Sequence, residues 1–301
     1  MAAVQVTEVG EPGARRGAVA AGIALRPRQW SKNLLLFAGI VFAAKLGDGE
    51  RWLEAIGAFA AYCAASSAAY LVNDVRDRAA DRAHPIKRSR PIARGELAPP
   101  AALALAAGLL AVAFAVTGLL GLHDALFLAG FVALQAVYTL GLKHVMLLDV
   151  AAIAGLFVLR AAAGAEAVDV RISPWLLACT ALLALFLALA KRRGELVLVG
   201  ARLTPGRRVL EGYSVQLCER LLQGAAAATV IAYAVYTLTA RDSKALAGTI
   251  PFVVLGVGRY LHLVHRHDLG EEPENVLLRD RPLLGAIAAW VVVAAVLLAT
   301  S

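Results

Sequence analysis

Long hydrophobic stretches alternate with short polar connections along almost the whole chain. The stretches are about 17 to 25 residues long, which is the length that an α-helix needs to cross a hydrocarbon layer of about 30 Å. The period-two alternation of a transmembrane β-barrel is absent from the pattern. The sequence therefore predicts an all-α, polytopic membrane protein, a bundle of nine transmembrane helices at residues 31–47, 52–72, 99–120, 123–142, 146–165, 173–191, 214–239, 247–264 and 282–300.

The beginning of the chain differs from the rest. Residues 1–22 are mostly small or polar and include Gly10, Pro12 and Gly13, so we expect a disordered cytoplasmic tail there. Residues 23–301 are expected to form a single transmembrane catalytic domain.

Composition excludes a soluble globular protein, because 60% of the 301 residues are hydrophobic, only 17% are charged and the mean hydropathy is +0.69. The three cysteines, Cys63, Cys179 and Cys218, lie within or beside apolar stretches. Their spacing supports neither a disulfide framework nor a zinc site.

The net charge of +8 is explained by topology. Most of the 30 lysines and arginines fall on one side of the predicted helices, and only Lys45, Arg51, Arg171, Arg241 and Lys244 fall on the other. By the positive-inside rule the basic side faces the cytoplasm, with the N-terminus inside and the C-terminus outside. We therefore expect a multi-pass plasma-membrane protein that does not bind nucleic acid and whose polar site opens to the cytoplasm.

The most informative stretch is NDVRDRAADRAHPIKRSRPIAR, residues 73–94, directly after the second apolar run. If its start is helical, Asn73, Asp77 and Asp81 stack along one face, with Asp74 to the side of that face. Clustered carboxylates at a membrane edge resist desolvation unless a cation offsets them, and such oxygen ligands suit Mg²⁺. Lys87 and Arg90 follow at once, and fixed positive charge beside a metal favours a diphosphate ligand. A solvated loop in which each Asp pairs with a neighbouring Arg is the alternative.

Other polar residues lie at the same predicted side. Lys32 is either an interfacial anchor or a phosphate ligand. Lys143 is either a phosphate ligand or a surface lysine that snorkels to the interface. Asp149 enters an otherwise apolar helix, where an ionised carboxylate is costly. Lys191 and Glu195 share a helical face, and Arg192 beside them either binds phosphate or marks the inner membrane boundary. Arg160 lies inside a predicted helix, and the sequence identifies no partner for it.

The combination of NDxxDxxxD after the second helix with HPxKxxRPxxxG (His84 to Gly95) resembles the UbiA superfamily of intramembrane prenyltransferases. The resemblance implies a nine-helix bundle that holds a diphosphate through Mg²⁺ on two Asp-rich motifs. The second of these, DxxxD, is replaced here by Lys191-x-x-x-Glu195, so a carboxylate has become an ammonium. This departure favours a donor other than an isoprenyl diphosphate.

One branch of that superfamily is similar over nearly the whole chain, from RPRQWSKN through YTLGLKH and KRRGEL to PENVLLRDR. It implies transfer of 5-phosphoribose from phosphoribosyl diphosphate to a polyprenyl (decaprenyl) phosphate, with release of pyrophosphate, in the synthesis of arabinan and arabinogalactan cell-wall precursors. The alternatives are a prenyltransferase acting on an aromatic or haem acceptor, and a non-catalytic lipid carrier or transporter. A homo-oligomer is compatible with the sequence.

That resemblance also implies roles for residues of this chain. Asp77, Asp81 and Lys191 would be catalytic, and Mg²⁺ would be held by Asn73, Asp74, Asp77 and Asp81. The substrates and their phosphates would be bound by Lys32, Lys87, Arg90, Tyr138, Lys143, Asp149, Lys191, Arg192 and Glu195.

Overall fold

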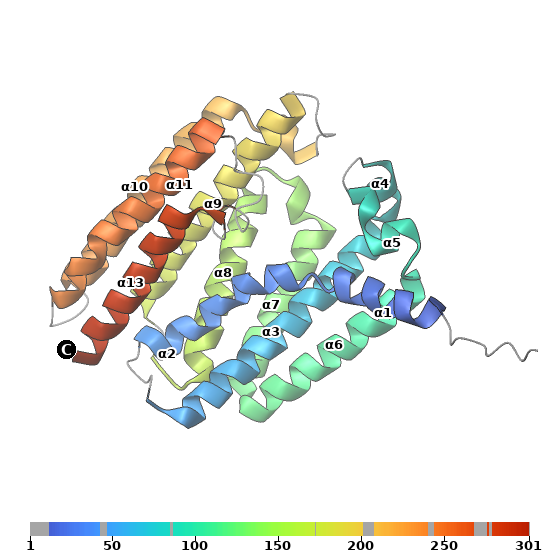
Figure 1. The fold of residues 1–301 in the computed structure, drawn as a ribbon, viewed down its shortest axis with the longest axis horizontal. Coiled ribbons are helices and arrows are strands. Elements are labelled where there is room, and N and C mark those ends of the chain that lie inside the picture. Colours follow the sequence, from blue (N-terminus) through green and yellow to red (C-terminus); the bar gives the residue numbers. More distant parts are fainter. Residues whose placement is uncertain are drawn as a thin grey trace, which may run out of the picture.

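Eight long helices carry the chain back and forth through the computed structural model, which describes residues 12–42, 47–84, 87–171, 173–200, 208–239, 244–267, 276 and 279–300 (Figure 1). The α-helices are α1 (Pro12–Ala24), α2 (Ala38–Phe42), α3 (Gly49–Arg76), α4 (Arg78–Ala83), α5 (Pro91–Arg94), α6 (Pro99–Leu120), α7 (Leu122–Leu140), α8 (Leu148–Ala167), α9 (Pro174–Gly200), α10 (Val215–Thr239), α11 (Ile250–His267) and α13 (Arg281–Thr300). The 3₁₀ segments are η1 (Pro27–Phe37), η2 (Lys87–Ser89), η3 (Leu142–His144), η4 (Arg208–Gly212) and η5 (Lys244–Thr249). No strand occurs in the described ranges, so the prediction of an all-α membrane protein is confirmed.

Local start and stop signals set several helix boundaries. The Asp48 carboxylate accepts hydrogen bonds from the backbone N–H groups of Glu50 and Arg51, at 3.1 and 3.3 Å, and so caps α3. Proline occupies the first position of α6 and of α9, where its missing N–H costs no helical hydrogen bond. Gly95 ends α5 in the left-handed region, with φ of 83°, which is accessible to glycine without steric cost.

The core has two main parts that meet at α8. One part is built from η1, α3, α6, α7 and α8, and includes Tyr62, Leu128 and Phe131. The other is built mainly from α9, α10, α11 and α13, around Phe186 and Tyr260, with Val150 of α8 in the same cluster. Because α8 contributes to both, its two ends are held in fixed positions between the halves.

Helix α8 contacts the segment formed by η1 and α2 directly through backbone atoms, with no side chain between them. A Cβ atom on Gly164 would lie 2.1 Å from the carbonyl oxygen of Leu36, and a Cβ on Gly39 would lie 2.5 Å from the carbonyl oxygen of Gly164. Glycine is therefore required at both positions, since no side chain fits between the two backbone segments.

The prediction of nine transmembrane helices is not confirmed. Eight helices in the described ranges are long and apolar enough to cross a membrane. Of the helix expected at 31–47, residues 31–42 instead belong to η1 and the short α2, and residues 43–46 lie outside the described ranges. The polar residues of η1 explain the departure, because Trp30 donates to Ser67 of α3 at 3.0 Å and the Asn33 amide donates to Cys63 at 3.3 Å. These contacts draw η1 into the bundle.

Within the stretch expected to be a disordered tail, residues 1–22, helix α1 begins at Pro12. Ala20 and Ala24 occur one turn apart and are both buried, and Ala24 packs with Ala68, Leu71 and Ile92. This small-residue face lets α1 lie against α3 and α5. Residues 1–11 lie outside the described ranges.

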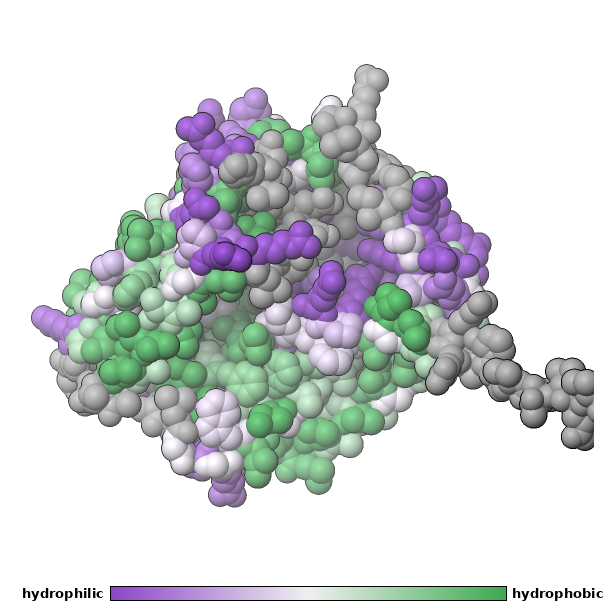
Figure 2. Space-filling view, in the orientation of Figure 1, coloured by the Kyte–Doolittle hydropathy of each residue, from purple (hydrophilic) through white to green (hydrophobic). Residues whose placement is uncertain are grey.

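Two helices extend beyond their apolar stretches and place polar residues at one end of the bundle. Helix α3 continues to Arg76 and α9 to Gly200, whereas the hydrophobic pattern predicted ends at 72 and 191. Hydrophilic residues gather over this end in Figure 2, and hydrophobic ones cover most of the lower part of the same face. The last turn of α3 and the last part of α9 therefore bring candidate site residues to the same end.

Candidate functional site

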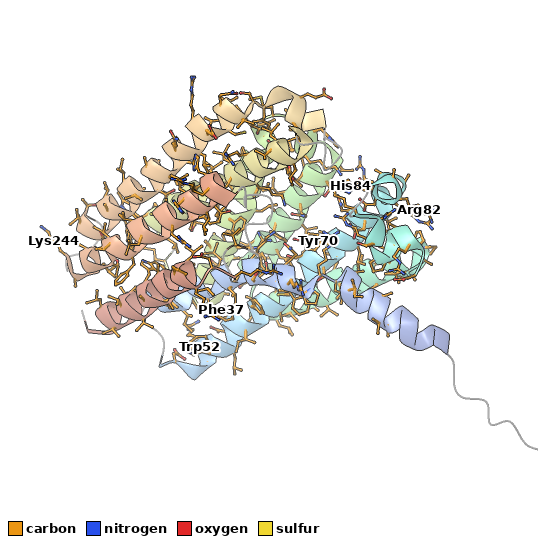
Figure 3. All side chains as sticks on the ribbon, turned by 45° about the horizontal axis from the view of Figure 1, so that its top comes forward. Phe37, Trp52, Tyr70, Arg82, His84 and Lys244 are labelled. Atoms are coloured by element: carbon orange, nitrogen blue, oxygen red, sulfur yellow. The ribbon has the colours of Figure 1, made fainter. Side chains whose placement is uncertain are left out.

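The candidate site lies at the end of the bundle where α3 gives way to α4, η2 and α5. Figure 3 shows Arg82 and His84 at this end and Lys244 at the far end of the molecule. Two arginines hold α4 onto α5, because Arg78 donates to the carbonyl of Ile92 at 3.2 Å and Arg82 to that of Ala93 at 2.8 Å. The stretch singled out in the sequence is thus a folded cap.

Two of its carboxylates are bound by arginines. Asp74 and Asp81 are buried, with 2% and 4% of their surface exposed. Arg26 contacts both oxygens of Asp74 at 2.6 and 2.7 Å, and one nitrogen of Arg90 bridges Asp74 at 3.0 Å and Asp81 at 2.7 Å. Charge-assisted contacts of this length offset the cost of burying the two carboxylates and fix the orientation of Arg90.

The other two oxygen-bearing residues share a lysine. The Lys143 ammonium lies 3.4 Å from the Asn73 amide oxygen and 3.1 and 3.0 Å from the two Asp77 oxygens. The Asp77 side chain is 32% exposed, so its carboxylate can be reached from outside the protein. Three oxygens therefore converge on one cation near the surface of the cap.

This arrangement corrects the expected helical face. Asp77 does not continue α3 but ends it, with φ and ψ of −87° and 6°, and α4 begins at Arg78. The turn separates Asp81 from Asn73 and Asp77 and places it with Asp74, which we had placed off the face. The aspartates are salt-bridged, as in the alternative, but not to the arginines next to them: Arg90 of the same stretch pairs with Asp74 and Asp81, and Arg26 and Lys143 come from elsewhere in the chain.

A second buried cluster lies at the same end. The Arg192 guanidinium is 1% exposed; it donates to Asp149 at 2.6 Å and also pairs with Glu195. The Tyr213 hydroxyl donates to the other Asp149 oxygen at 2.7 Å. Burial, together with this hydrogen bond, raises the pKa of Tyr213, so the phenol keeps its proton at neutral pH and continues to donate.

The second cluster is joined to the first through η3 and the turn after it. Lys143 belongs to η3, and the N–H of Leu147 donates to the Tyr213 hydroxyl at 2.9 Å. Leu147 has a φ of 64°, a value that a leucine adopts only when its surroundings impose it. The hydrogen bond from Leu147 to Tyr213 therefore fixes the turn that positions Lys143 and Asp149.

The remaining sequence candidates lie around these clusters. Lys32 is on η1, where its ammonium donates to Gln29 at 2.5 Å, and the N–H of Lys87 donates to the His84 ring at 3.3 Å. Tyr138 lies close enough to Arg192 for an electrostatic interaction. Lys191 is half-buried on α9, and its expected companion Glu195 is bound by Arg192.

Several residues of the site were missed by the sequence. Arg26 and Tyr213 carry no local signal, because their partners Asp74 and Asp149 lie 48 and 64 residues away along the chain. Asn33 is the partner that Arg160 lacked: its amide oxygen accepts from Arg160 at 2.7 Å, and the Phe131 ring lies 4.7 Å from the same guanidinium. Polar residues of η1 thus connect the site to the centre of the bundle.

Comparison with known proteins identifies the family. The UbiA prenyltransferase family matches residues 34–279 of the chain. The chain belongs to the UbiA prenyltransferase family. It is accordingly a multi-pass membrane enzyme of the UbiA type.

Relatives within the UbiA family are similar over most of their length. The decaprenyl-phosphate phosphoribosyltransferase of Mycolicibacterium smegmatis is 37% identical over 285 residues, which are 89% of this chain and 89% of the relative. The protein of the same name from Mycobacterium tuberculosis is 35% identical over 278 residues, 89% of this chain and 90% of the relative.

Solved UbiA structures have the same fold. A UbiA homologue from Archaeoglobus fulgidus, bound to DMAPP and Mg²⁺, superposes with a TM-score of 0.73 at 18% identity, covering 94% of this chain and 100% of the homologue. Digeranylgeranylglyceryl phosphate synthase superposes with a TM-score of 0.66 at 12% identity, covering 97% of this chain and 100% of that one. At these identities the likeness is one of fold.

Proposed function

We propose that the chain transfers 5-phosphoribose from phosphoribosyl diphosphate to a polyprenyl phosphate such as decaprenyl phosphate, with release of pyrophosphate. The observation that carries the proposal is the similarity to phosphoribosyltransferases over 89% of this chain and 89% of the relative. The site supports the proposal, because arginines pair with the carboxylates that a second metal-binding motif would need.

The second motif of the family is neutralised in this chain. Asp149 and Glu195 both pair with Arg192, and Arg193 pairs with Glu219 at 3.0 Å. The carboxylates of this cluster are therefore bound to arginines and are unsuited to a second divalent ion. We assign the cluster the role of positioning η3 and the end of α9.

The residues of the first cluster fit a hard divalent ion such as Mg²⁺. Asn73 and Asp77 direct three oxygens to one point, now held by an ammonium, and Mg²⁺ binds proteins through one or two carboxylates together with substrate phosphates. No three acidic, histidine or cysteine side chains in the described ranges form a ready-made metal site, so the donor's diphosphate would complete the ligand set. When bound, the ion would neutralise negative charge on the diphosphate and on the departing pyrophosphate.

Arg90 and Lys143 are the cations that we assign to the phosphates. Asp74 and Asp81, first placed among the metal ligands, hold Arg90, so we assign them to positioning that guanidinium. Lys32, Lys87 and Lys191 supply further positive charge near the same end. Fixed cations stabilise the negative charge that builds on a leaving group without having to reorganise.

The proposed reaction needs no strong base. An oxygen of the acceptor phosphate bonds to C1 of the ribose, and the bond from C1 to the pyrophosphate oxygen breaks, its electron pair leaving with pyrophosphate. The ribose gains oxocarbenium character between these events, as in other glycosyl transfers. Because the acceptor phosphate is already ionised, holding the two substrates in line supplies much of the rate.

The site's place in the membrane follows from its substrates. The donor is water-soluble and the acceptor is a lipid, so the polar end of the bundle should lie at the membrane surface with the isoprenoid between helices below it. We place the protein in the plasma membrane, and the distribution of lysine and arginine supports an orientation with this end in the cytoplasm.

Transfer of an isoprenoid to an aromatic or haem acceptor is the second candidate, because the homologue from Archaeoglobus fulgidus binds DMAPP and Mg²⁺. The two functions are separated by supplying purified enzyme with Mg²⁺ and either radiolabelled phosphoribosyl diphosphate and decaprenyl phosphate, or labelled isoprenyl diphosphate and an aromatic acceptor. We expect labelled lipid only in the first reaction. Product in the second reaction alone would refute the proposal.

Lys143→Ala is expected to tighten the apparent binding of Mg²⁺ by about five- to thirtyfold while lowering the maximal rate. The ammonium competes with the ion for Asn73 and Asp77, and removing a unit charge about 3 Å away is worth about 1–2 kcal/mol in this partly exposed setting. The measurement is the Mg²⁺ dependence of the initial rate at saturating donor. Lys244→Ala, an exposed lysine at the opposite end, is the matched control. An unchanged or weaker Mg²⁺ dependence in Lys143→Ala would show that the ion binds elsewhere.

A further inference from the structure

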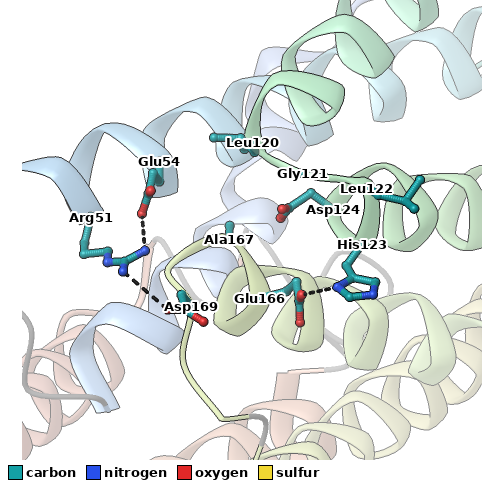
Figure 4. A pocket seen from close by; sticks show the side chains of 10 residues that line it. All are labelled: Arg51, Glu54, Leu120, Gly121, Leu122, His123, Asp124, Glu166, Ala167 and Asp169. Atoms are coloured by element: carbon teal, nitrogen blue, oxygen red, sulfur yellow. Dashed lines mark hydrogen bonds and ion pairs between the residues drawn. The ribbon is translucent and has the colours of Figure 1, made fainter.

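The opposite end of the bundle has a polar pocket of its own (Figure 4). It has a volume of about 230 Å³ and lies where the start of α3, the α6–α7 junction and the end of α8 meet. The titratable residues that line it are Arg51, Glu54, His123, Asp124, Glu166 and Asp169. These residues come from the end of the chain's helices that carries neither cluster of the proposed active site.

Most of the charges in this pocket pair with one another. Arg51 lies 2.9 Å from Glu54 and 3.5 Å from Asp169, and the His123 ring lies 3.2 Å from Glu166. Four carboxylates therefore face one arginine and one histidine. With His123 neutral the pocket keeps a strong negative excess, which attracts cations.

Asp124 is the exception to this pairing. It is 8% exposed, it lines the pocket, and among the described residues its carboxylate accepts a hydrogen bond only from its own backbone N–H. Figure 4 shows its carboxylate directed into the hollow, between Glu54 and Glu166. The N-terminus of α7 offsets only part of a unit charge, so the remaining cost of burying this carboxylate is unmet.

We propose that this pocket binds a divalent cation that keeps part of its water shell, with Asp124 as its principal protein ligand. Carboxylate oxygens select hard divalent ions over softer ones. No three acidic, histidine or cysteine side chains of the described ranges converge at direct coordination distance, so water must fill several ligand positions. A volume of about 230 Å³ holds an ion with several waters at about 30 Å³ each, but lies below the range of ordinary organic ligands.

The bound ion would link three helices at the end remote from the proposed chemistry. Glu54 belongs to α3, Asp124 to α7 and Glu166 to α8. A site open to solvent and built from few protein ligands binds such ions at about 10⁻⁴ to 10⁻³ M. The proposal does not depend on the function proposed above, because the two sites lie at opposite ends.

The test uses Mn²⁺ as the probe on purified full-length protein in detergent. We expect Asp124→Asn to bind one Mn²⁺ fewer than wild type by equilibrium dialysis, or to bind it at least about tenfold more weakly. In wild type, Mn²⁺ at ten times the dissociation constant should favour the folded state about elevenfold and raise the unfolding midpoint. Glu50→Gln, an exposed carboxylate at the same end but outside the pocket, should behave as wild type.

Two further variants keep the outcome decisive. Asp77→Asn removes the ligand assigned to the other end, so Asp77→Asn with Asp124→Asn should bind no Mn²⁺, whereas Asp77→Asn alone should still bind one ion. If Asp124→Asn does not fold, Glu166→Gln on the facing wall should weaken binding in its place. Equal Mn²⁺ binding by wild type and by the pocket variants would overturn the proposal.

Discussion

Asp77→Asn is expected to lower Mg²⁺-dependent phosphoribosyl transfer by about 10²- to 10³-fold, the loss typical of removing one electrostatic contact to a developing charge. The Asp77 carboxylate is accessible, whereas those of Asp74 and Asp81 are buried, and it makes two of the three contacts to the Lys143 ammonium. Asparagine keeps the shape and the turn but removes the charge. The measurement is the initial rate as a function of Mg²⁺, together with the thermal unfolding midpoint, which should change little.

Asp81→Asn should reduce kcat/KM for the donor by a similar factor for a different reason. It releases Arg90, which Asp81 contacts at 2.7 Å, so the loss should be seen as weaker binding of the donor and not as a changed Mg²⁺ dependence. Glu96→Gln is the control, because Glu96 is an exposed partner of Arg94 at the same end. Wild-type rates in either aspartate variant at limiting Mg²⁺ would contradict the assignment of this cluster.

Arg192→Met is expected to destabilise the protein by about 3–5 kcal/mol, because it leaves Asp149 and Glu195 buried without their cation. Both carboxylates would have to take up protons or draw water into the bundle. Thermal or denaturant unfolding in a fixed detergent measures the loss, and turnover should fall with it because η3 depends on Asp149 and Tyr213.

Arg259→Met provides the comparison for Arg192→Met. Arg259 pairs with Asp280 at 2.8 Å, and the pair is more exposed, with 38% and 15% of the two side chains accessible. Solvent screens exposed ion pairs, so this variant should lose much less stability. Equal losses in the two variants would show that the buried cluster around Arg192 is not a structural element.

The periodic and apolar features of the sequence predicted most of the fold. Helix α10 matches its expected bounds, 214–239, to within one residue, because a long and mostly apolar segment has few alternatives to a membrane-spanning helix. The prediction of a transmembrane helix at 31–47 failed because the path of η1 and α2 depends on tertiary packing. Gly39 and Gly164 allow the two backbone segments to cross in contact, and hydropathy cannot reveal such a crossing. The predicted ends of α3 and α9 were too early for a similar reason, because a helix continues past its apolar stretch when its polar side chains find partners.

The candidate site was predicted in composition but not in pairing. The sequence brought Asn73, Asp77 and Asp81 to one end correctly, because an apolar helix fixes where its polar terminus emerges. It could not show that Asp74 pairs with Arg26, 48 residues away, or that Lys143 reaches Asp77 from 66 residues away. Such pairs depend on the packing of distant helices and leave no local trace in the chain.

The crossing of η1 and α8 limits how the bundle can open. Where two backbone segments touch with no side chain between them, no rotamer can swing aside to open a path, and separating the segments would lose the close van der Waals contacts along the crossing. An acceptor that slips between helices from the lipid phase must therefore enter along another seam, and the first segment and α8 should move as one rigid body during each catalytic cycle.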